Sequence, residues 1–274
     1  MSSYHSKTGL FAPQPAKVAQ VAHSHPVPLP PDVPVDALLR LEGVHTHIGA
    51  YHILHGVDLV VPRGQLTMLL GRNGAGKTTT LRTIMGLWQA SQGRVVFNGQ
   101  DITREHTPDI AGRNIAYVPE NMGIFADLTV RENMLLAARQ AKRANQMDEA
   151  RLQWIFKLFP AVEKFWLHPA GKLSGGQKQM LAVSRAIVEP RDLLIFDEPS
   201  KGLAPVMINN MIDAFQQLKH SGTTILLVEQ NINFAKRLGD TVAVMDDGRV
   251  VHAGSMQALA QDEALQRSLL GLAL

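Results

Sequence analysis

One short segment, residues 71–78, constrains the fold of this chain more than any other. Its residues are Gly71, Arg72, Asn73, Gly74, Ala75, Gly76, Lys77 and Thr78. They follow the pattern of a glycine, four residues, a second glycine, a lysine and then a serine or threonine, which is typical of phosphate-binding loops. Residues 65–70 are an apolar run typical of a buried strand, and residues 78–88 have helical spacing. Because a strand precedes the loop and a helix follows it, a chance glycine-rich turn is disfavoured.

The residue types in this loop predict how it would bind a nucleotide. Its glycines let backbone N–H groups converge on phosphate oxygens, and the following helix directs its positive end to the same place. Lys77 would reach the β- and γ-phosphates, and the Thr78 hydroxyl would ligate Mg²⁺. Thr79 follows in the first turn of the helix and is included among the expected ATP contacts. The sequence therefore predicts ATP and Mg²⁺ as cofactors.

The chain from residue 38 onward alternates between strand and helix patterns. Strands are expected at residues 38–48, 53–61, 94–97, 114–118, 193–196 and 224–228, with a hairpin at residues 241–253 around an Asp-Asp-Gly turn. Helices are expected at residues 128–142, 148–159, 176–188 and 206–218. This alternation indicates an α/β domain with a mainly parallel sheet. The helical stretch at about residues 121–172 is expected to be an inserted subdomain.

Two acidic residues, Asp197 and Glu198, follow the apolar strand expected at residues 193–196. A parallel strand beside the phosphate loop would deliver its carboxyl end to the same crevice. There Asp197 would hold Mg²⁺ through water, and Glu198 would act as general base on the water that attacks the γ-phosphate. The two acids followed by a proline also suit a surface turn, and alone they would favour neither interpretation. The phosphate loop decides for the catalytic one.

A third segment, residues 173–177, holds no acid, base or nucleophile but opens a helix. It could form a second anion-binding helix N-terminus that closes over a γ-phosphate from the far side. It could equally be an ordinary N-cap serine followed by two glycines in the first turn, and taken alone this is the simpler interpretation. Its residues are Leu173, Ser174, Gly175, Gly176 and Gln177.

Together and in this order, these segments resemble the nucleotide-binding subunit of ATP-binding cassette (ABC) transporters. The resemblance covers residues from about 38 to the end of the chain. It implies a P-loop NTPase of the ABC type, with a mainly parallel sheet core, an antiparallel β subdomain and the inserted helical subdomain. It also implies a head-to-tail dimer, in which Ser174, Gly175, Gly176 and Gln177 of one subunit contact ATP held by the loop of the other. We therefore expect an ABC ATPase domain at residues 37–274.

Finer similarities narrow the family. Residues 117–120, 128–130, 198–205 and 228–231 are similar to the second ATPase subunit of branched-chain amino acid importers, which pairs with a different ATPase subunit. The implied partners are membrane permease subunits, a second ATPase subunit in a heterodimer or a homodimer, and indirectly a substrate-binding protein. An importer of urea, amides or aromatic acids and an exporter remain alternatives. A non-transport ABC ATPase is a further one, although the chain lacks the sustained heptads of DNA-associated members.

Three positions depart from the wider family. Glu120 stands where most relatives have a glutamine that contacts Mg²⁺, and Gln230 stands where most have a histidine that contacts the γ-phosphate. A carboxylate can still ligate Mg²⁺, although it adds negative charge, and an amide can still donate a hydrogen bond. The amino acid importer subtype commonly shows both replacements. Where relatives stack adenine on an aromatic residue this chain has Ile48, and either Ile48 or the nearby Tyr51 would contact the base.

Composition excludes several classes of protein and site. The formal net charge is only +3 and the basic residues are scattered, so no nucleic-acid partner is expected. Without cysteines, neither a disulfide framework nor a cysteine metal site is possible. No apolar run approaches the ~18 residues of a membrane-spanning helix. We expect a peripheral subunit on the cytoplasmic face of the inner (plasma) membrane.

Two further predictions concern the first residues of the chain and the helical stretch. Residues 1–36 hold seven prolines and three histidines and are expected to form an extended tail without a packed core. In the helical stretch, aromatic side chains on amphipathic segments are candidates for an apolar groove that docks the membrane partner, although several would suit the core equally well. These are Phe125, Trp154, Phe159 and Trp166.

Overall fold

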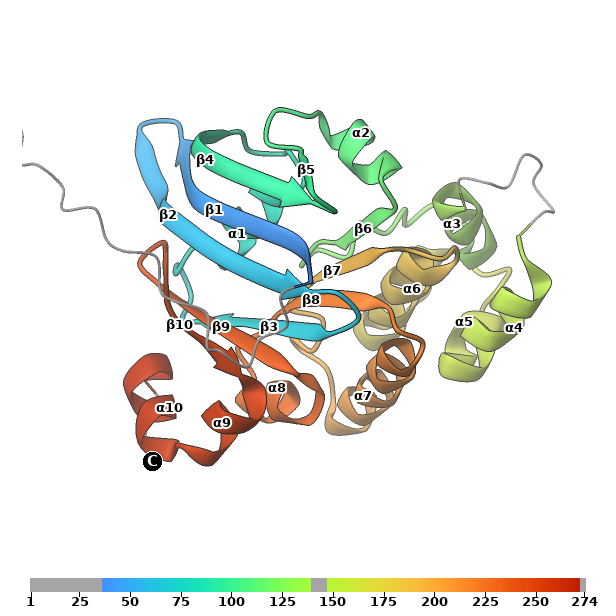
Figure 1. Ribbon diagram of the computed structural model, residues 1–274. Coiled ribbons are helices and arrows are strands. Elements are labelled where there is room, and N and C mark those ends of the chain that lie inside the picture. Colours follow the sequence, from blue (N-terminus) through green and yellow to red (C-terminus); the bar gives the residue numbers. More distant parts are fainter. Residues whose placement is uncertain (1–35, 139–146, 272–274) are drawn as a thin grey trace, which may run out of the picture.

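The computed structural model describes residues 36–138 and 147–271 (Figure 1). Of the tail predicted at residues 1–36, all but Asp36 lies outside the described residues, as do residues 139–146 and 272–274.

Two sheets form the framework. The larger has the strand order β10-β9-β3-β8-β7-β6, and its strands are parallel except for β10, which is antiparallel to β9. The smaller is antiparallel, with the order β2-β1-β4-β5. This arrangement confirms the predicted parallel core and antiparallel β subdomain. The strands are β1 (Ala37–Ile48), β2 (Tyr51–Pro62), β3 (Leu66–Gly71), β4 (Ala90–Phe97), β5 (Gln100–Asp101), β6 (Ile115–Val118), β7 (Leu193–Asp197), β8 (Thr224–Val228), β9 (Thr241–Asp246) and β10 (Arg249–Ser255).

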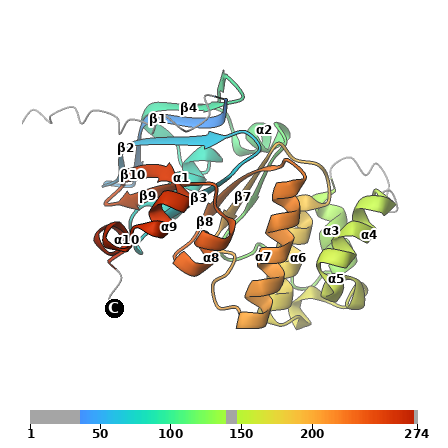
Figure 2. The same ribbon diagram turned by 60° about the horizontal axis from the view of Figure 1, so that its bottom comes forward.

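The helices lie on both faces of the six-stranded sheet. Helix α1 lies between the two sheets, whereas α6, α7 and α8 cover the opposite face (Figures 1 and 2). Helices α3, α4 and α5 pack beside α6 at one edge, within the stretch expected to be the helical subdomain. The helices are α1 (Lys77–Ile84), α2 (Thr107–Gly112), α3 (Val130–Ala137), α4 (Glu149–Leu158), α5 (Pro160–Lys164), α6 (Gly175–Ile187), α7 (Pro205–His220), α8 (Ile232–Leu238), α9 (Met256–Gln261) and α10 (Glu263–Leu270), with a 3₁₀ turn at Ala170–Lys172.

The alternation of side chains along the central strands explains why they read as continuous apolar runs. In β7, Ile195 joins the core that contains α1, whereas Phe196 joins the core under α6 and α7. In β8, Leu226 and Leu227 divide in the same way. Because successive residues point to opposite faces and both faces are covered by helices or by the second sheet, every position of these two strands except Asp197 and Thr224 is apolar.

Two sequence predictions about element placement differ from the structure. Strand β7 pairs with β8 and β6, so β8 separates it from the strand of the phosphate loop. Helix α1 ends at Ile84 rather than near residue 88, and the chain turns at Gly86, which has a φ of 67°. A side chain at Gly86 would lie 2.9 Å from the Glu105 carbonyl oxygen, so the end of the helix is set by a tertiary contact.

Candidate active site

The phosphate loop connects β3 to α1 and packs closely against β9, the turn after β9 and β2. A Cβ atom at Gly71 would lie 2.3 Å from the Met245 carbonyl oxygen, and one at Gly76 would lie 3.0 Å from Leu54 Cδ2. Both glycines have a positive φ, which L side chains rarely adopt. Gly248, in the turn between β9 and β10, donates its N–H to the Ala75 carbonyl at 3.0 Å. These contacts explain Gly71 and Gly76, whereas Gly74 has a φ of 82° and nothing within 4 Å of a Cβ atom.

The N-terminus of α1 is open to an anion. Its N-cap is Gly76, which offers no capping side chain, and its first turn contains no acidic residue. Lys77 is buried, and its Nζ donates to the carbonyls of Gly71 at 2.8 Å and Arg72 at 3.0 Å. Burial lowers the pKa of Lys77, and the nearby Glu198 opposes that shift. A cation inside the loop and a free helix N-terminus together suit phosphate.

Asp197 reaches the start of α1 although β7 is not adjacent to β3. The Thr78 hydroxyl donates to Asp197 Oδ1 at 3.2 Å, and the Tyr117 hydroxyl lies 3.5 Å from Oδ2. Burial raises the pKa of Asp197, whereas the hydrogen bond from Thr78 lowers it. A hydroxyl and a carboxylate side by side are hard oxygen donors that fit Mg²⁺.

Glu198 lies among donors on three sides. Its Oε1 accepts a hydrogen bond from Gln230 Nε2 and lies 3.9 Å from Lys77 Nζ. Its Oε2 lies 3.4 Å from Lys201 Nζ. The side chain is 9% exposed, and the backbone has a φ of 52°, which is uncommon for a residue other than glycine. The structure thus brings together the three residues predicted to be catalytic: Lys77, Glu198 and Gln230.

Glu120 follows β6 and lies at the rim of the same site. Lys201 Nζ donates to Glu120 Oε1 at 2.6 Å. The Glu120 side chain is 48% exposed, and its charge contributes to the raised pKa of Asp197.

No role was predicted for Glu229, whose buried carboxylate accepts hydrogen bonds from three backbone N–H groups of the site. Its Oε1 accepts from the Ser200 N–H at 2.9 Å, and its Oε2 accepts from the N–H groups of Gln230 at 3.2 Å and Asn231 at 3.3 Å. Burial raises the pKa of Glu229, and these hydrogen bonds oppose the shift. The Glu229 carboxylate therefore holds both the turn after Glu198 and Gln230, which donates to Glu198. The sequence signal that could have indicated this role is an acidic residue directly after the apolar strand at residues 224–228.

The segment at residues 173–177 begins α6. Ser174 and Gln177 form a capping box, in which Ser174 Oγ accepts from the Gln177 N–H and Gln177 Oε1 accepts from the Ser174 N–H. A Cβ atom at Gly176 would lie 2.7 Å from Met207 Cε, so this glycine allows α7 to approach. A Cβ atom at Gly175 would meet nothing within 4 Å. Ser174 is thus an N-cap, but packing within this chain does not explain Gly175, and the contact of this segment with a partner's nucleotide stays a prediction.

Ile48 and Tyr51 pair across the turn between β1 and β2. Ile48 is partly buried, whereas Tyr51 is 76% exposed. Which of them contacts adenine stays a prediction.

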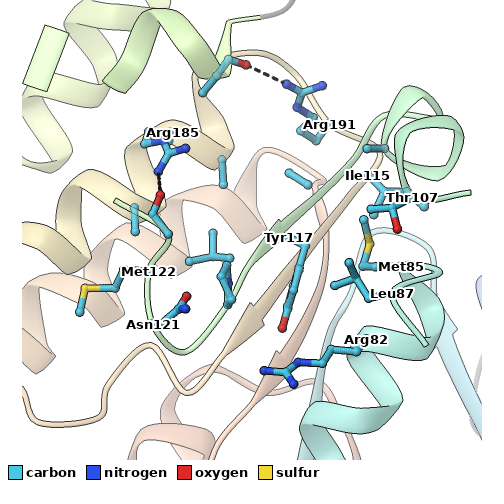
Figure 3. A pocket seen from close by; sticks show the side chains of 18 of the residues that line it. Arg82, Met85, Leu87, Thr107, Ile115, Tyr117, Asn121, Met122, Arg185 and Arg191 are labelled. Carbon is cyan, nitrogen blue, oxygen red and sulfur yellow. Dashed lines mark hydrogen bonds between the residues drawn. The ribbon is translucent and has the colours of Figure 1, made fainter. Parts of the chain in front are cut away.

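An open groove of about 730 Å³ lies between α1, α2 and β6 on one side and α3 and α6 on the other (Figure 3). Leu87 and Leu136 line it and are 50% and 59% exposed. At one end Tyr117 and Arg82 point toward one another, which connects the groove to Asp197 (Figure 3).

The groove differs from the one predicted. Of the four aromatic candidates, Phe159 is fully buried, so the prediction is wrong for this residue. Trp154 and Trp166 pack against the core, and in the described part of the chain neither lines the groove. Phe125 is half exposed, with the Arg185 guanidinium 5.2 Å from its ring centre.

The comparison with protein families agrees with this geometry. The ABC transporter family model matches residues 54–201. This chain belongs to the ABC transporter family. It is therefore an ABC ATPase subunit, and ATP binding and hydrolysis are the activity of its family.

Curated relatives match this ABC ATPase over nearly their whole length. One is the high-affinity branched-chain amino acid transport ATP-binding protein BraG of Pseudomonas aeruginosa, which is 36% identical over 85% of this chain and 100% of the relative. Another is the probable branched-chain amino acid transport ATP-binding protein LivF of Archaeoglobus fulgidus, which is 34% identical over 86% and 99%.

Solved structures support the same assignment. An ATP-binding subunit of an ABC transporter is 30% identical and has a TM-score of 0.72, covering 85% of this chain and 96% of the other. The ADP conformation of another ATP-binding cassette is 25% identical and has a TM-score of 0.71 over 86% and 99%. Within the described residues, no helix of this ABC ATPase has both the length and the apolar character needed to cross a membrane.

Proposed function

We propose that this ABC ATPase is the second ATPase subunit of a branched-chain amino acid importer, working in a heterodimer with a different ATPase subunit. The names of the relatives from P. aeruginosa and A. fulgidus support the substrate class. The presence of Glu120 and Gln230 supports the subtype. The observation that carries the catalytic part is the convergence of Lys77 and Gln230 on the carboxylate of Glu198.

In this proposal each residue has a defined role toward ATP. The loop residues 71–76 and the first N–H groups of α1 bind the phosphates, while Lys77 neutralises the β- and γ-phosphates. Thr78, Asp197 and Glu120 would hold Mg²⁺, which when bound supplies further charge neutralisation. Glu198 accepts the proton of the attacking water, and Gln230 donates an amide hydrogen bond to the γ-phosphate. Thr79 adds a donor in the first helical turn.

The second half of the ATP site would come from another subunit. Helices α1 and α6 cover opposite faces of the six-stranded sheet (Figures 1 and 2). The start of α6 is thus separated from the phosphate loop of its own chain, which supports a contact with the nucleotide of a partner instead. Ser174 and Gly175 are exposed, and space around Gly175 is free. Ser174, Gly175, Gly176 and Gln177 would then contact the partner's γ-phosphate. Ile48 would provide an apolar contact to adenine.

The membrane permease subunits would dock in the groove lined by Leu87 and Leu136. Its position supports coupling, because the groove ends at Tyr117, whose hydroxyl lies 3.5 Å from Asp197 Oδ2. Movement of the helical subdomain, with Glu120 as hinge, would transmit closure of the ATP site to the permease. The subunit would thus be peripheral on the cytoplasmic face of the membrane.

The catalytic assignment is tested by Glu198→Gln. The amide keeps the size of the side chain but cannot accept a proton, so we expect ATP turnover of the assembled complex to fall about 10²- to 10⁴-fold, with ATP binding retained. Glu42→Gln, which removes an exposed ion pair with Arg94, is the control and should leave turnover unchanged. Unchanged turnover in Glu198→Gln would refute the proposed mechanism.

The substrate and partners need a separate experiment. The complex purified from native membranes in mild detergent should contain two permeases and a second ATPase subunit, and after reconstitution in vesicles it should accumulate labelled leucine in an ATP-dependent manner. Uptake of urea or an aromatic acid instead of leucine would reassign the substrate. Recovery of the chain without permeases would contradict the transport role.

A further inference from the structure

A lysine in the turn after Glu198 bridges two carboxylates of the ATP site. Lys201 Nζ lies 2.6 Å from Glu120 Oε1 and 3.4 Å from Glu198 Oε2. Glu120 is 81 positions away in the sequence and follows a different strand. The lysine thus joins the residue expected at Mg²⁺ to the residue expected to be the general base.

The backbone around Lys201 is fixed while its side chain stays accessible. The Lys201 N–H donates to the Glu198 carbonyl at 3.1 Å, and the preceding N–H of Ser200 donates to Glu229 at 2.9 Å. The Lys201 side chain is 58% exposed. The turn therefore places the ammonium group accurately at the mouth of the site, and the side chain can still move when ATP enters.

The charges around the ATP site indicate what the contact of Lys201 with Glu120 and Glu198 does. Four carboxylates lie near the start of α1: those of Glu120, Asp197 and Glu198, and that of Glu229, which is buried and bonded to backbone N–H groups. The positive groups near these carboxylates are the ammonium groups of Lys77 and Lys201 and the guanidinium of Arg82, which acts on Asp197. The carboxylates of Glu120 and Glu198 both lie within ion-pair distance of the same Lys201 ammonium group.

We infer that Lys201 is a positioning residue that compensates the charge introduced by Glu120. It neutralises the Glu120 carboxylate and holds Glu198 on the side opposite Lys77, so that ATP can enter a site that would otherwise carry excess negative charge. This inference rests on the proposed ATP binding. A merely structural ion pair between Lys201 and Glu120 would have a different signature, because its loss would lower the stability of the fold and leave ATP affinity unchanged. In this inference the effect of Lys201 on ATP affinity depends on the charge at position 120.

A double-mutant cycle on ATP binding tests this dependence. Affinity is measured with the full chain in the presence of EDTA, where no Mg²⁺ masks the carboxylates, for the wild type, Lys201→Met, Glu120→Gln and the double variant. We expect Lys201→Met to weaken ATP binding about fivefold in the wild-type background and only about twofold in the Glu120→Gln background. Both effects should shrink in high salt because partly exposed charges are screened.

A control ion pair lies at the amino ends of the parallel strands, at the other end of the sheet from the ATP site. Lys219 forms an ion pair with Asp240 at the same distance of 2.6 Å, far from the carboxyl ends of the strands. Lys219→Met should leave ATP affinity unchanged. Equal effects of Lys201→Met in both backgrounds, or an effect no larger than that of Lys219→Met, would overturn the inference. Failure of the wild type to bind ATP would instead refute the proposed function.

Discussion

At the scale of single residues, the backbone of Glu198 is the least ordinary feature of the site. Its φ of 52° is costly for a residue with a Cβ atom, so the surrounding structure must stabilise it. The Glu198 N–H donates to the Val228 carbonyl at 3.0 Å, and Glu229 binds the turn through the Ser200 N–H. The residue proposed as general base is therefore oriented by a buried carboxylate that follows the neighbouring strand β8.

This dependence predicts the effect of Glu229→Ala. The substitution leaves buried N–H groups of Ser200, Gln230 and Asn231 without their acceptor, so we expect the free energy of unfolding to fall by about 1–3 kcal/mol and ATP turnover to fall with it. Chemical denaturation gives the first quantity. Glu263→Ala, which breaks only an exposed ion pair with Arg267, is the control and should change stability by less than about 0.5 kcal/mol. Equal stability of the two variants would show that Glu229 does not hold the turn.

At the scale of elements, the hairpin of β1 and β2 carries a cluster of histidines on one face. His45 Nδ1 lies 3.0 Å from His52 Nε2, and the rings of His47 and His55 stack or tilt against His52 at 4.2 and 4.1 Å. Burial lowers the pKa of His45, followed by the charges of His55, Arg249 and His47. Burial also lowers the pKa of His52, followed by its histidine neighbours.

These shifts predict a loss of stability in mild acid. Because the pKa of each group is lower in the folded state than in the unfolded state, the unfolded chain binds protons first as the pH falls below about 6.5. The melting temperature should therefore be maximal above that pH and decrease as the pH falls through the folded pKa values. His45→Gln with His52→Gln should flatten this dependence, whereas His220→Gln on α7 should not. A slope unchanged in the double variant would exclude the cluster as its source.

The turn between β9 and β10 is an element that connects the phosphate loop to this hairpin. Gly248 has a φ of 71°, and a Cβ atom there would lie 2.1 Å from the Ile53 carbonyl oxygen. We expect Gly248→Ala to destabilise the protein by several kcal/mol and to weaken ATP binding. Gly222→Ala is matched, because its φ of 78° is similar and its surroundings are open, so it should cost only about 1–2 kcal/mol. Similar losses in both variants would show that the close contact is unimportant.

At the scale of the whole molecule, the groove of Figure 3 lies between the sheet with α1 and the helices at the edge. An exposed apolar side chain in such a groove suits a partner rather than solvent. Leu136→Asp places a charge in the lining of the groove without touching the phosphate loop. We expect ATP affinity to stay unchanged while recovery of permeases in the purified complex falls at least about tenfold. Lys157→Asp, on α4 outside the groove lining, is the control, and retained permeases in Leu136→Asp would contradict docking there.

The sequence alone determined the phosphate loop, the division into strands and helices and the two acids at the end of β7. These depend on spacing, on alternation and on residue types over a few positions, which are local properties. The resemblance of the sequence motifs to ABC transporter ATPases also placed Lys77, Glu198 and Gln230 in one predicted site. The short helices α8, α9 and α10 were not predicted, because helices of this length depend on packing rather than on propensity.

Only the tertiary structure decided which distant residues meet. It placed β8 between β3 and β7, brought Lys201 to Glu120, set Glu229 beneath the catalytic turn and formed the groove beside Leu136. Each of these contacts joins segments far apart in the chain, so it depends on the order of strands in the sheet and on the packing of helices over it. Local spacing carries no information about that order, because any of the buried apolar strands could occupy a central position.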